Sequence, residues 1–209
     1  MGTSILSIFK TIALGIAVVA IMTLSQSTAK ADAVTFSTAG CFGTGCVPGL
    51  AATTTGTNTV ALAFAGIATA SVATPTFADL ATFTLTGVGT FSATPFTLVV
   101  TQTQPGPPGS GTFSATLSGT VFVENNVQGS TVVIVFSTLS RTINGITYDL
   151  INLTGGNTLA LDPAATGGIT RLTARISGSA VPEPTSMLLL GTGLVGAAGA
   201  ARRRFRVRS

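Results

Sequence analysis

Apolar and hydroxyl-bearing residues alternate one by one through much of this chain, and this is the period of a β-strand with one buried face. Residues 78–86 place Phe83 and Leu85 on one face and threonines on the other. The same period runs through residues 112–124, where the apolar or small positions are Phe113, Ala115, Leu117, Gly119, Val121 and Val123. Residues 34–180 show no convincing helical stripe, so the pattern predicts an all-β domain.

Further strands and turns follow from the same signals. The pattern predicts strands at residues 96–103, 131–138 and 170–177, and turns at residues 104–111, 125–130 and 144–145. Residues 131–138 are apolar enough for a central strand. Asn144-Gly145 is the strongest hairpin signal, because a type I′ turn needs positive φ at both positions. The alanine-rich residues 60–72 are the one stretch for which a helix stays open.

An internal repeat also bears on the architecture. The sequence GTFSAT occurs at residues 89–94 and again at residues 111–116. A stacked solenoid needs at least three repeats, so two similar strands inside one sandwich explain the pair better. Short strands separated by glycine, proline and asparagine turns predict a single antiparallel β-sandwich-like domain over residues 34–180.

The N-terminus has the order of a secretory signal peptide. Lys10 supplies the positive charge, residues 11–24 are uncharged and apolar, and residues 25–33 are small and polar. Two small-x-small sites predict cleavage after Ala31 or Ala33. Residues 1–33 are therefore predicted to direct export.

The C-terminus combines a rigid motif, an apolar segment and a basic cluster. Val181, Pro182, Glu183 and Pro184 form an extended element, because proline fixes φ and biases the preceding residue toward extended geometry. Residues 185–201 carry no charge and would form a helix about 25 Å long, the short limit for spanning a bilayer. The positive-inside rule places the residues that follow in the cytoplasm: Arg202, Arg203, Arg204, Arg206 and Arg208.

This C-terminal arrangement resembles the PEP-CTERM sorting signal of Gram-negative and related bacteria. The matching parts are residues 182–184, the apolar residues 185–201 and the basic residues 202–208. The resemblance covers residues 181–209 and says nothing about the domain before them. It implies an exosortase as partner, a membrane-embedded cysteine transpeptidase-like enzyme that processes near the Pro-Glu-Pro. It also implies export in bacteria that make exopolysaccharide, often in biofilms or flocs.

The basic character of the chain belongs to its ends. The whole chain has a formal net charge of +4. Between residues 34 and 180 the charged residues are Arg141, Arg171 and Arg175 against Asp79, Glu124, Asp149 and Asp162, three minus four or −1. Nucleic-acid binding needs a clustered basic surface, so the sequence argues against it.

The two cysteines, Cys41 and Cys46, are predicted to form a local disulfide. An exported chain favours oxidation, and glycines at positions 43 and 45 allow a tight loop. A zinc site lacks partners, because the chain has no histidine and no other cysteine.

Catalytic chemistry is not indicated. Without histidine there is no Ser-His-Asp or Cys-His arrangement. The four carboxylates of residues 34–180 are isolated in sequence, whereas a glycosidase needs two that flank one bond. We therefore expect no enzyme, no cofactor and no metal site, although calcium near residues 124–126 or Asp162 is conceivable.

Two classes of function remain. The first is a structural surface or matrix protein, anchored at first in the inner membrane with its domain outside, whose hydroxyl-rich faces contact exopolysaccharide. The second is a specific carbohydrate- or calcium-dependent binding module. Tyr148 is the only tyrosine and there is no tryptophan, and this lack of aromatic platforms favours the matrix protein.

Overall fold

The computed structural model describes residues 33–178, 191–194 and 196 of the 209-residue chain. Residues 33–178 contain thirteen β-strands and one short 3-10 helix, η1 (Ala164–Thr166). All strand pairings in this part of the chain are antiparallel. Residues 191–194 and 196 are helical. The expectation of an antiparallel all-β domain is therefore confirmed.

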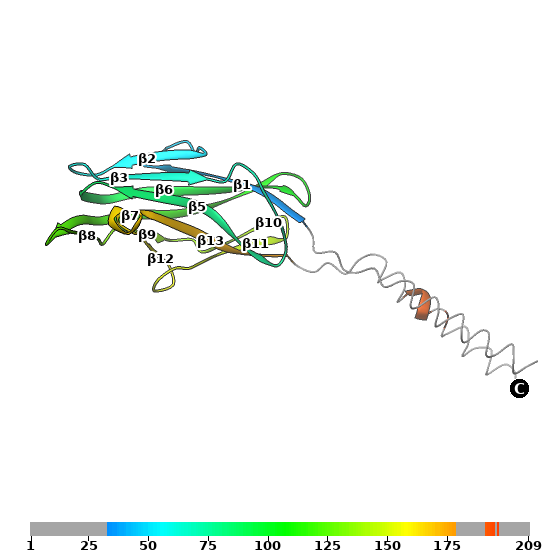
Figure 1. Ribbon diagram of the computed structural model, residues 1–209. Helices are drawn as coiled ribbons and strands as arrows, with labels where there is room; N and C mark the ends of the chain where they lie inside the picture. Colours follow the sequence, from blue (N-terminus) through cyan, green and yellow to red (C-terminus); the bar gives the residue numbers. More distant parts are fainter. Residues whose placement is uncertain (1–32, 179–190, 195, 197–209) are drawn as a thin grey trace, which may run out of the picture.

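The strands form two sheets that lie face to face (Figure 1). Sheet A has the order β12 (Thr158–Ala160), β9 (Val133–Phe136), β7 (Gly109–Glu124), β6 (Gly89–Gln104), β1 (Ala33–Phe42) and β4 (Ala70–Ala73), with β8 (Val127–Ser130) also paired to β7. Sheet B has the order β10 (Ser140–Ile143), β11 (Ile146–Ile151), β13 (Ile169–Gly178), β5 (Thr76–Thr86), β3 (Ala61–Gly66) and β2 (Ala51–Thr55).

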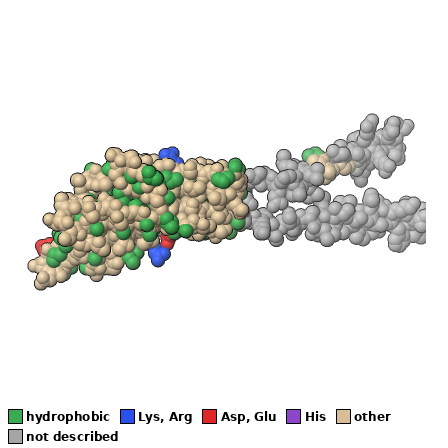
Figure 2. All heavy atoms as spheres, turned by 90° about the horizontal axis from the view of Figure 1, so that it is seen from above, with side chains coloured by type: hydrophobic (Ala, Val, Ile, Leu, Met, Phe, Trp, Pro, Cys, Tyr) green, Lys and Arg blue, Asp and Glu red, His purple; other side chains and the backbone are tan. Residues whose placement is uncertain are grey.

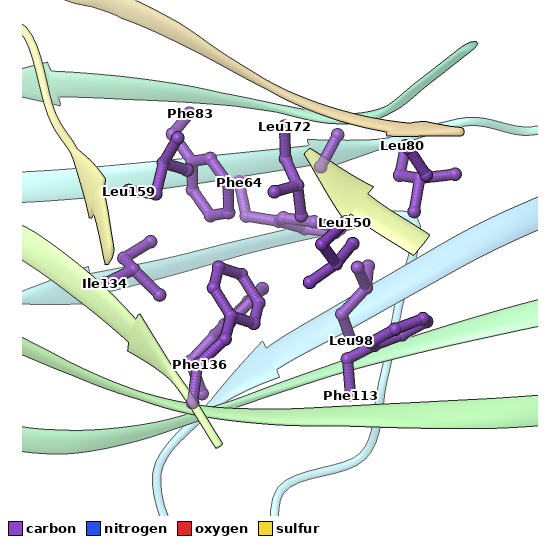
Figure 3. Packing of buried hydrophobic residues seen from close by; sticks show 14 of the residues in the cluster. Phe64, Leu80, Phe83, Leu98, Phe113, Ile134, Phe136, Leu150, Leu159 and Leu172 are labelled. Atoms are coloured by element: carbon purple, nitrogen blue, oxygen red, sulfur yellow. The ribbon is translucent and has the colours of Figure 1, made fainter. Parts of the chain in front are cut away.

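One hydrophobic core fills the space between the sheets. Alternate residues of each strand point inward, as the period of 2 requires, so both sheets contribute large side chains to it. Phe83 on β5 packs against Phe64 on β3 and Phe96 on β6, with ring centroids 5.7 and 5.4 Å away. Figure 3 shows Phe64 and Phe83 of sheet B converging on Ile134 and Phe136 of sheet A. These aromatic contacts join the two sheets.

Residues 33–178, called the body below, contain one hydrophobic core. Every hydrophobic residue of the core cluster lies between Val34 and Ile176. Among the described residues, no buried side-chain nitrogen or oxygen lacks a hydrogen-bond partner. A domain with its own complete core folds without its flanking segments.

Both ends of the body lie at the same end of the fold. Ala33 pairs with Ala73, and Ile176 pairs with Thr76, only three positions further along the chain. Figure 1 shows β1 beginning and β13 ending on this side. Any segments that flank the body therefore start from one end of it.

Several predicted elements agree closely with the structure. The strand predicted at residues 78–86 is β5, with Phe83 and Leu85 buried and Thr82 and Thr84 partly exposed. Residues 112–124 belong to β7 and residues 170–177 to β13. The turn at Asn144-Gly145 has φ of 49° and 78° and joins β10 to β11, as the type I′ prediction requires.

The structure refines other details of the prediction. The strand predicted at residues 131–138 is β9, which lies between β7 and β12, and its Val133 and Val135 are partly exposed. Residues 60–72 contain strands β3 and β4 and no helix. Val123 is 55 % exposed rather than buried, because the β7–β8 hairpin extends past the last residues of β6 that pair with it.

The predicted signal peptide (residues 1–33) lies outside the described residues except for Ala33, where β1 begins. The predicted membrane helix (residues 185–201) is described only at 191–194 and 196. Among the residues that the structure describes, no helix has the length and apolar character needed to cross a membrane.

A buried polar pair links the two sheets inside the core. The hydroxyl of Tyr148 on β11 donates a hydrogen bond to Oε1 of Gln102 on β6, at 3.1 Å. Gln102 in turn donates from Nε2 to the carbonyl oxygen of Pro105 at 3.1 Å. Both side chains are completely buried, so each depends on the other for its hydrogen bonds. Burial raises the pKa of Tyr148 from 10.0 to about 12.

The stability of the body is expected to fall as the pH rises from about 10 to about 12. Because the pKa of Tyr148 is higher in the folded state, the unfolded chain loses this proton first. The stabilisation is thus complete below the unfolded pKa and is lost as the pH approaches the folded value. The body contains no lysine and no other tyrosine, so no other side chain of this unit has its ordinary pKa in this range.

Denaturant titrations of the body at several pH values between 8 and 12 measure this effect, and absorbance at 295 nm reports the ionisation of the single tyrosine. The control is Tyr148→Phe, which should be less stable at pH 8 by about 1–3 kcal/mol, because Gln102 Oε1 loses its donor. That variant should no longer lose stability above pH 10. An equal alkaline loss in both proteins would contradict the assignment to Tyr148.

Candidate functional site

The outer face of sheet A is uncharged and rich in hydroxyl groups. Since Phe96, Leu98 and Val100 of β6 point inward, the intervening residues of β6 and their neighbours point outward. No charged side chain occupies an outward position on β1, β4, β6, β9 or β12. Charges occur only at the margins of β7, where Glu124 ends the strand and Arg141 of β10 donates from Nε to the carbonyl of Thr112. Hydroxyl-bearing residues gather on this surface, called the hydroxyl face below: Thr35, Ser37, Thr97, Thr101, Ser110, Thr112, Ser114 and Thr116.

Cross-strand pairing places these hydroxyl groups in rows. Ser37 on β1 lies opposite Thr101 on β6, and Thr101 lies opposite Ser110 on β7. Thr97 lies opposite Ser114 in a parallel row. Residues in such rows are about 5 Å apart, so the face offers donors and acceptors at regular spacing.

Charged groups occur on the outer face of sheet B. Arg171 Nη1 on β13 lies 2.8 Å from Asp79 Oδ2 on β5, and Thr173 donates to Asp79 Oδ1 at 2.9 Å. Asp149 on β11 lies opposite Arg175 and accepts a hydrogen bond from Ser140 on β10. The two outer faces of the body therefore differ in chemistry: one is neutral, and the other carries both signs of charge.

The structure keeps the candidate acidic residues apart. Glu124 ends β7 at the hairpin turn, where Asn125 and Asn126 have φ of 51° and 64°. Asp162 precedes η1, and its backbone N–H donates to Thr170 Oγ1 at 2.9 Å. Among the described residues, no three histidine, cysteine or acidic side chains come together as metal ligands.

Cys41 and Cys46 form a disulfide in the structure, with Cα atoms 5.8 Å apart. Cys41 is buried near the end of β1. The loop it closes contains Gly43 and Gly45, with φ of 98° and 68°, conformations that glycine adopts at little cost. A pair of backbone hydrogen bonds between Gly40 and Gly49 closes the base of this loop. The disulfide is therefore placed to stabilise the connection between β1 and β2.

Replacing both cysteines by serine is expected to lower the free energy of unfolding of the body by about 2 kcal/mol, as chain-entropy arguments give for so short a loop. Urea denaturation of the body and of the double variant measures the difference. The matched control is the wild-type body after reduction, which should show a similar loss. A stability unchanged by both treatments would contradict this role for the disulfide.

The C-terminal residues are similar to a known sorting motif. Residues 180–204 match the family described as the PEP-CTERM protein-sorting motif. The chain carries a PEP-CTERM sorting signal. This match includes Val181, Pro182, Glu183 and Pro184, and the basic residues Arg202, Arg203 and Arg204. Arg206 and Arg208 follow it, and all these residues lie outside the described part of the structure.

The PEP-CTERM signal indicates an exported protein that is processed by an exosortase. The match is confined to the C-terminus, as the sequence resemblance predicted. No curated protein and no solved structure is similar to the chain at a significant level. The function of the body therefore has to be argued from its own surfaces.

The contrast between the two faces could not be read from single strands. The sequence shows only that residues 33–78 contain no charged side chain, and these residues contribute strands to both sheets. These residues supply all of β1, β2, β3 and β4. Only the sheet order shows that they gather along one side of the body.

Proposed function

We propose that this is a structural, non-catalytic protein of the cell surface or extracellular matrix whose hydroxyl face contacts exopolysaccharide. Its precursor is held in the inner membrane by residues 185–201, with the body outside and the terminal arginines in the cytoplasm. Exosortase then processes it near residues 182–184. The observation that carries the contact with polysaccharide is the wide, uncharged and hydroxyl-rich outer face of sheet A.

The chemistry of this face suits a neutral, hydroxyl-rich polymer. Each threonine or serine hydroxyl both donates and accepts hydrogen bonds, as sugar hydroxyls do. Val99 on β6 and Val135 on β9 lie between them and offer apolar contact to the C–H groups of sugars. Such contacts are individually weak, and a long polymer strengthens them by binding many sites at once.

A co-sedimentation experiment tests the proposal. The body is mixed with exopolysaccharide from a producing bacterium, and the bound fraction is measured. In the test variant, valine replaces four threonines of the hydroxyl face: Thr97, Thr101, Thr112 and Thr116. In the matched control, valine replaces four outward threonines of sheet B: Thr82, Thr84, Thr86 and Thr147. Valine has a high β-propensity and nearly the shape of threonine, so both variants should fold.

We expect the test variant to bind about tenfold more weakly and the control to bind like the wild type, a difference of about 1.4 kcal/mol. Equal effects of the two variants would contradict a role for the hydroxyl face. A single tight ligand on a glycan array would instead favour a specific carbohydrate-binding module.

A further inference from the structure

Strand β2 ends sheet B with an open edge. Gly66 N–H donates to the carbonyl of Leu50 at 2.7 Å, and Gly56 N–H donates to that of Val60 at 3.0 Å. These bonds fix the register. The backbone N–H and C=O groups of the even-numbered residues of β2 therefore point toward β3, and those of the odd-numbered residues point away from it. The backbone N–H and C=O groups of Thr53 and Thr55 therefore point to the outer edge. β1 reaches this edge at Gly49, which exchanges two hydrogen bonds with Gly40, and in the described part of the chain no strand pairs with the edge from Ala51 to Thr55.

The other sheet edges are better protected against pairing with a foreign strand. On β10, Arg141 places a charge at the edge and donates from Nε to the carbonyl of Thr112 at 2.7 Å. β12 has only three residues and follows a turn closed by hydrogen bonds between Thr154 and Thr158. β4 has four residues and leads into Pro75. Charges, prolines and short length are the usual protections of edge strands, and the five residues of β2 include no charge and no proline.

The surroundings of β2 are neutral and partly apolar. Val47 is 87 % exposed and Leu50 is 51 % exposed, and both precede β2 in the chain. The nearest charged residue after β2 in sequence is Asp79, on β5. β2 is the uppermost strand in Figure 1, and the view from above in Figure 2 shows charged side chains only at the margins of this side.

We propose that the β2 edge binds the β2 edge of a second copy of this chain, in antiparallel orientation about a two-fold axis. An antiparallel edge is complementary to itself, because each N–H meets a C=O when the strand is turned around. The neutral surface brings no like charges together and buries no charge, as the cores of stable interfaces require. The two-fold pairing places Thr53 opposite its counterpart and Ala51 opposite Thr55, and the bond between Gly49 and Gly40 limits the contact to these five residues.

The antiparallel orientation also determines where the chain ends of the second copy lie. β2 runs antiparallel to β3, and β3 runs antiparallel to β5, so β2 points away from the end where Thr76 and both ends of the body lie. A second copy turned around by the two-fold axis has its chain ends on the opposite side. Two precursors in one membrane are therefore unable to pair in this way, whereas released molecules are able to. This step rests on the proposed function, in which exosortase processing ends the membrane attachment.

Sedimentation equilibrium of the body without polysaccharide tests the pairing itself. We expect a reversible dimer, and Thr53→Lys should raise its dissociation constant by about tenfold or more, since lysine on an edge strand opposes pairing. The matched control is Thr142→Lys, an exposed threonine on β10, the opposite edge strand of sheet B, which should leave the dimer unchanged. Thr55→Lys is a second edge variant and should weaken the dimer as Thr53→Lys does.

Cross-linking gives an independent measurement. Cα atoms of hydrogen-bonded antiparallel partners are about 5.5 Å apart, so a short bismaleimide should join two Thr53→Cys chains and not two Thr142→Cys chains. A body that stays monomeric, a dimer insensitive to both lysine variants, or equal cross-linking at both positions would overturn the proposal. These readouts need no polysaccharide, so they are independent of the co-sedimentation result.

Discussion

Replacing Pro182, Glu183 and Pro184 by alanine is expected to abolish exosortase processing and leave the protein as a membrane-bound precursor. The sequence predicts that the two prolines favour extended backbone here, and alanine is expected to allow residues 181–184 to continue the predicted helix of residues 185–201. The enzyme would then meet neither the extended backbone nor the carboxylate of Glu183. An epitope inserted between the exposed Gly155 and Gly156 allows precursor and product to be distinguished by size and by cell fraction.

The control makes the same chemical change in the body, with Pro107 and Pro108 replaced by alanine. These prolines lie in the exposed loop between β6 and β7, so their replacement should leave processing intact. Normal release of the triple alanine variant would contradict the exosortase assignment. Equal retention of both variants would show a folding defect rather than a lost sorting signal.

The strands that sequence predicted best are those whose two faces differ most. In β5, Phe83 and Leu85 alternate with threonines, and in β13, Leu172 and Ala174 alternate with Arg171 and partly exposed Thr173. Asn144-Gly145 marked its hairpin because few other residues adopt positive φ so readily. Local chemistry was sufficient at these places.

The first part of the body was harder to predict, because small and neutral residues occupy both faces. In β3, alanines fill the positions between Leu62 and Phe64, and alanine is also a good helix former. In β1, Thr38 points inward, where its hydroxyl donates to the carbonyl of Leu80 at 2.6 Å and accepts from Ile67 N–H at 2.7 Å. A buried threonine with two partners looks like a surface residue in sequence alone.

The candidate sites also differ in how far the sequence alone predicts them. The sorting signal is linear, and the matching family covers residues 180–204 without reference to any fold. The hydroxyl face and the β2 edge depend instead on which strands are neighbours. Asp79 and Arg171 are far apart in the chain and adjacent in sheet B, and only that pairing shows that the charges lie on the opposite face from the hydroxyl rows.

Phe83→Ala is expected to lower the free energy of unfolding of the body by about 3–5 kcal/mol, the usual cost of deleting a buried aromatic ring. Phe83 is completely buried and contacts Phe64 of its own sheet and Phe96 of the other. Phe64 has little room to move into the cavity, because its ring lies directly over Gly40 of β1. The loss is a large part of the 5–15 kcal/mol that stabilises a typical domain.

The same strand supplies a matched control in Phe77, which is 66 % exposed on the outer face of sheet B. Phe77→Ala removes the same atoms from β5 without opening a cavity, so its effect should stay below about 1 kcal/mol. Urea denaturation of the body and both variants, followed by circular dichroism, measures the difference. If the two substitutions cost the same, β-propensity rather than packing between the sheets would determine the stability of β5. If only Phe83→Ala is costly, the aromatic contacts between sheets A and B hold the hydroxyl face and the β2 edge in their places.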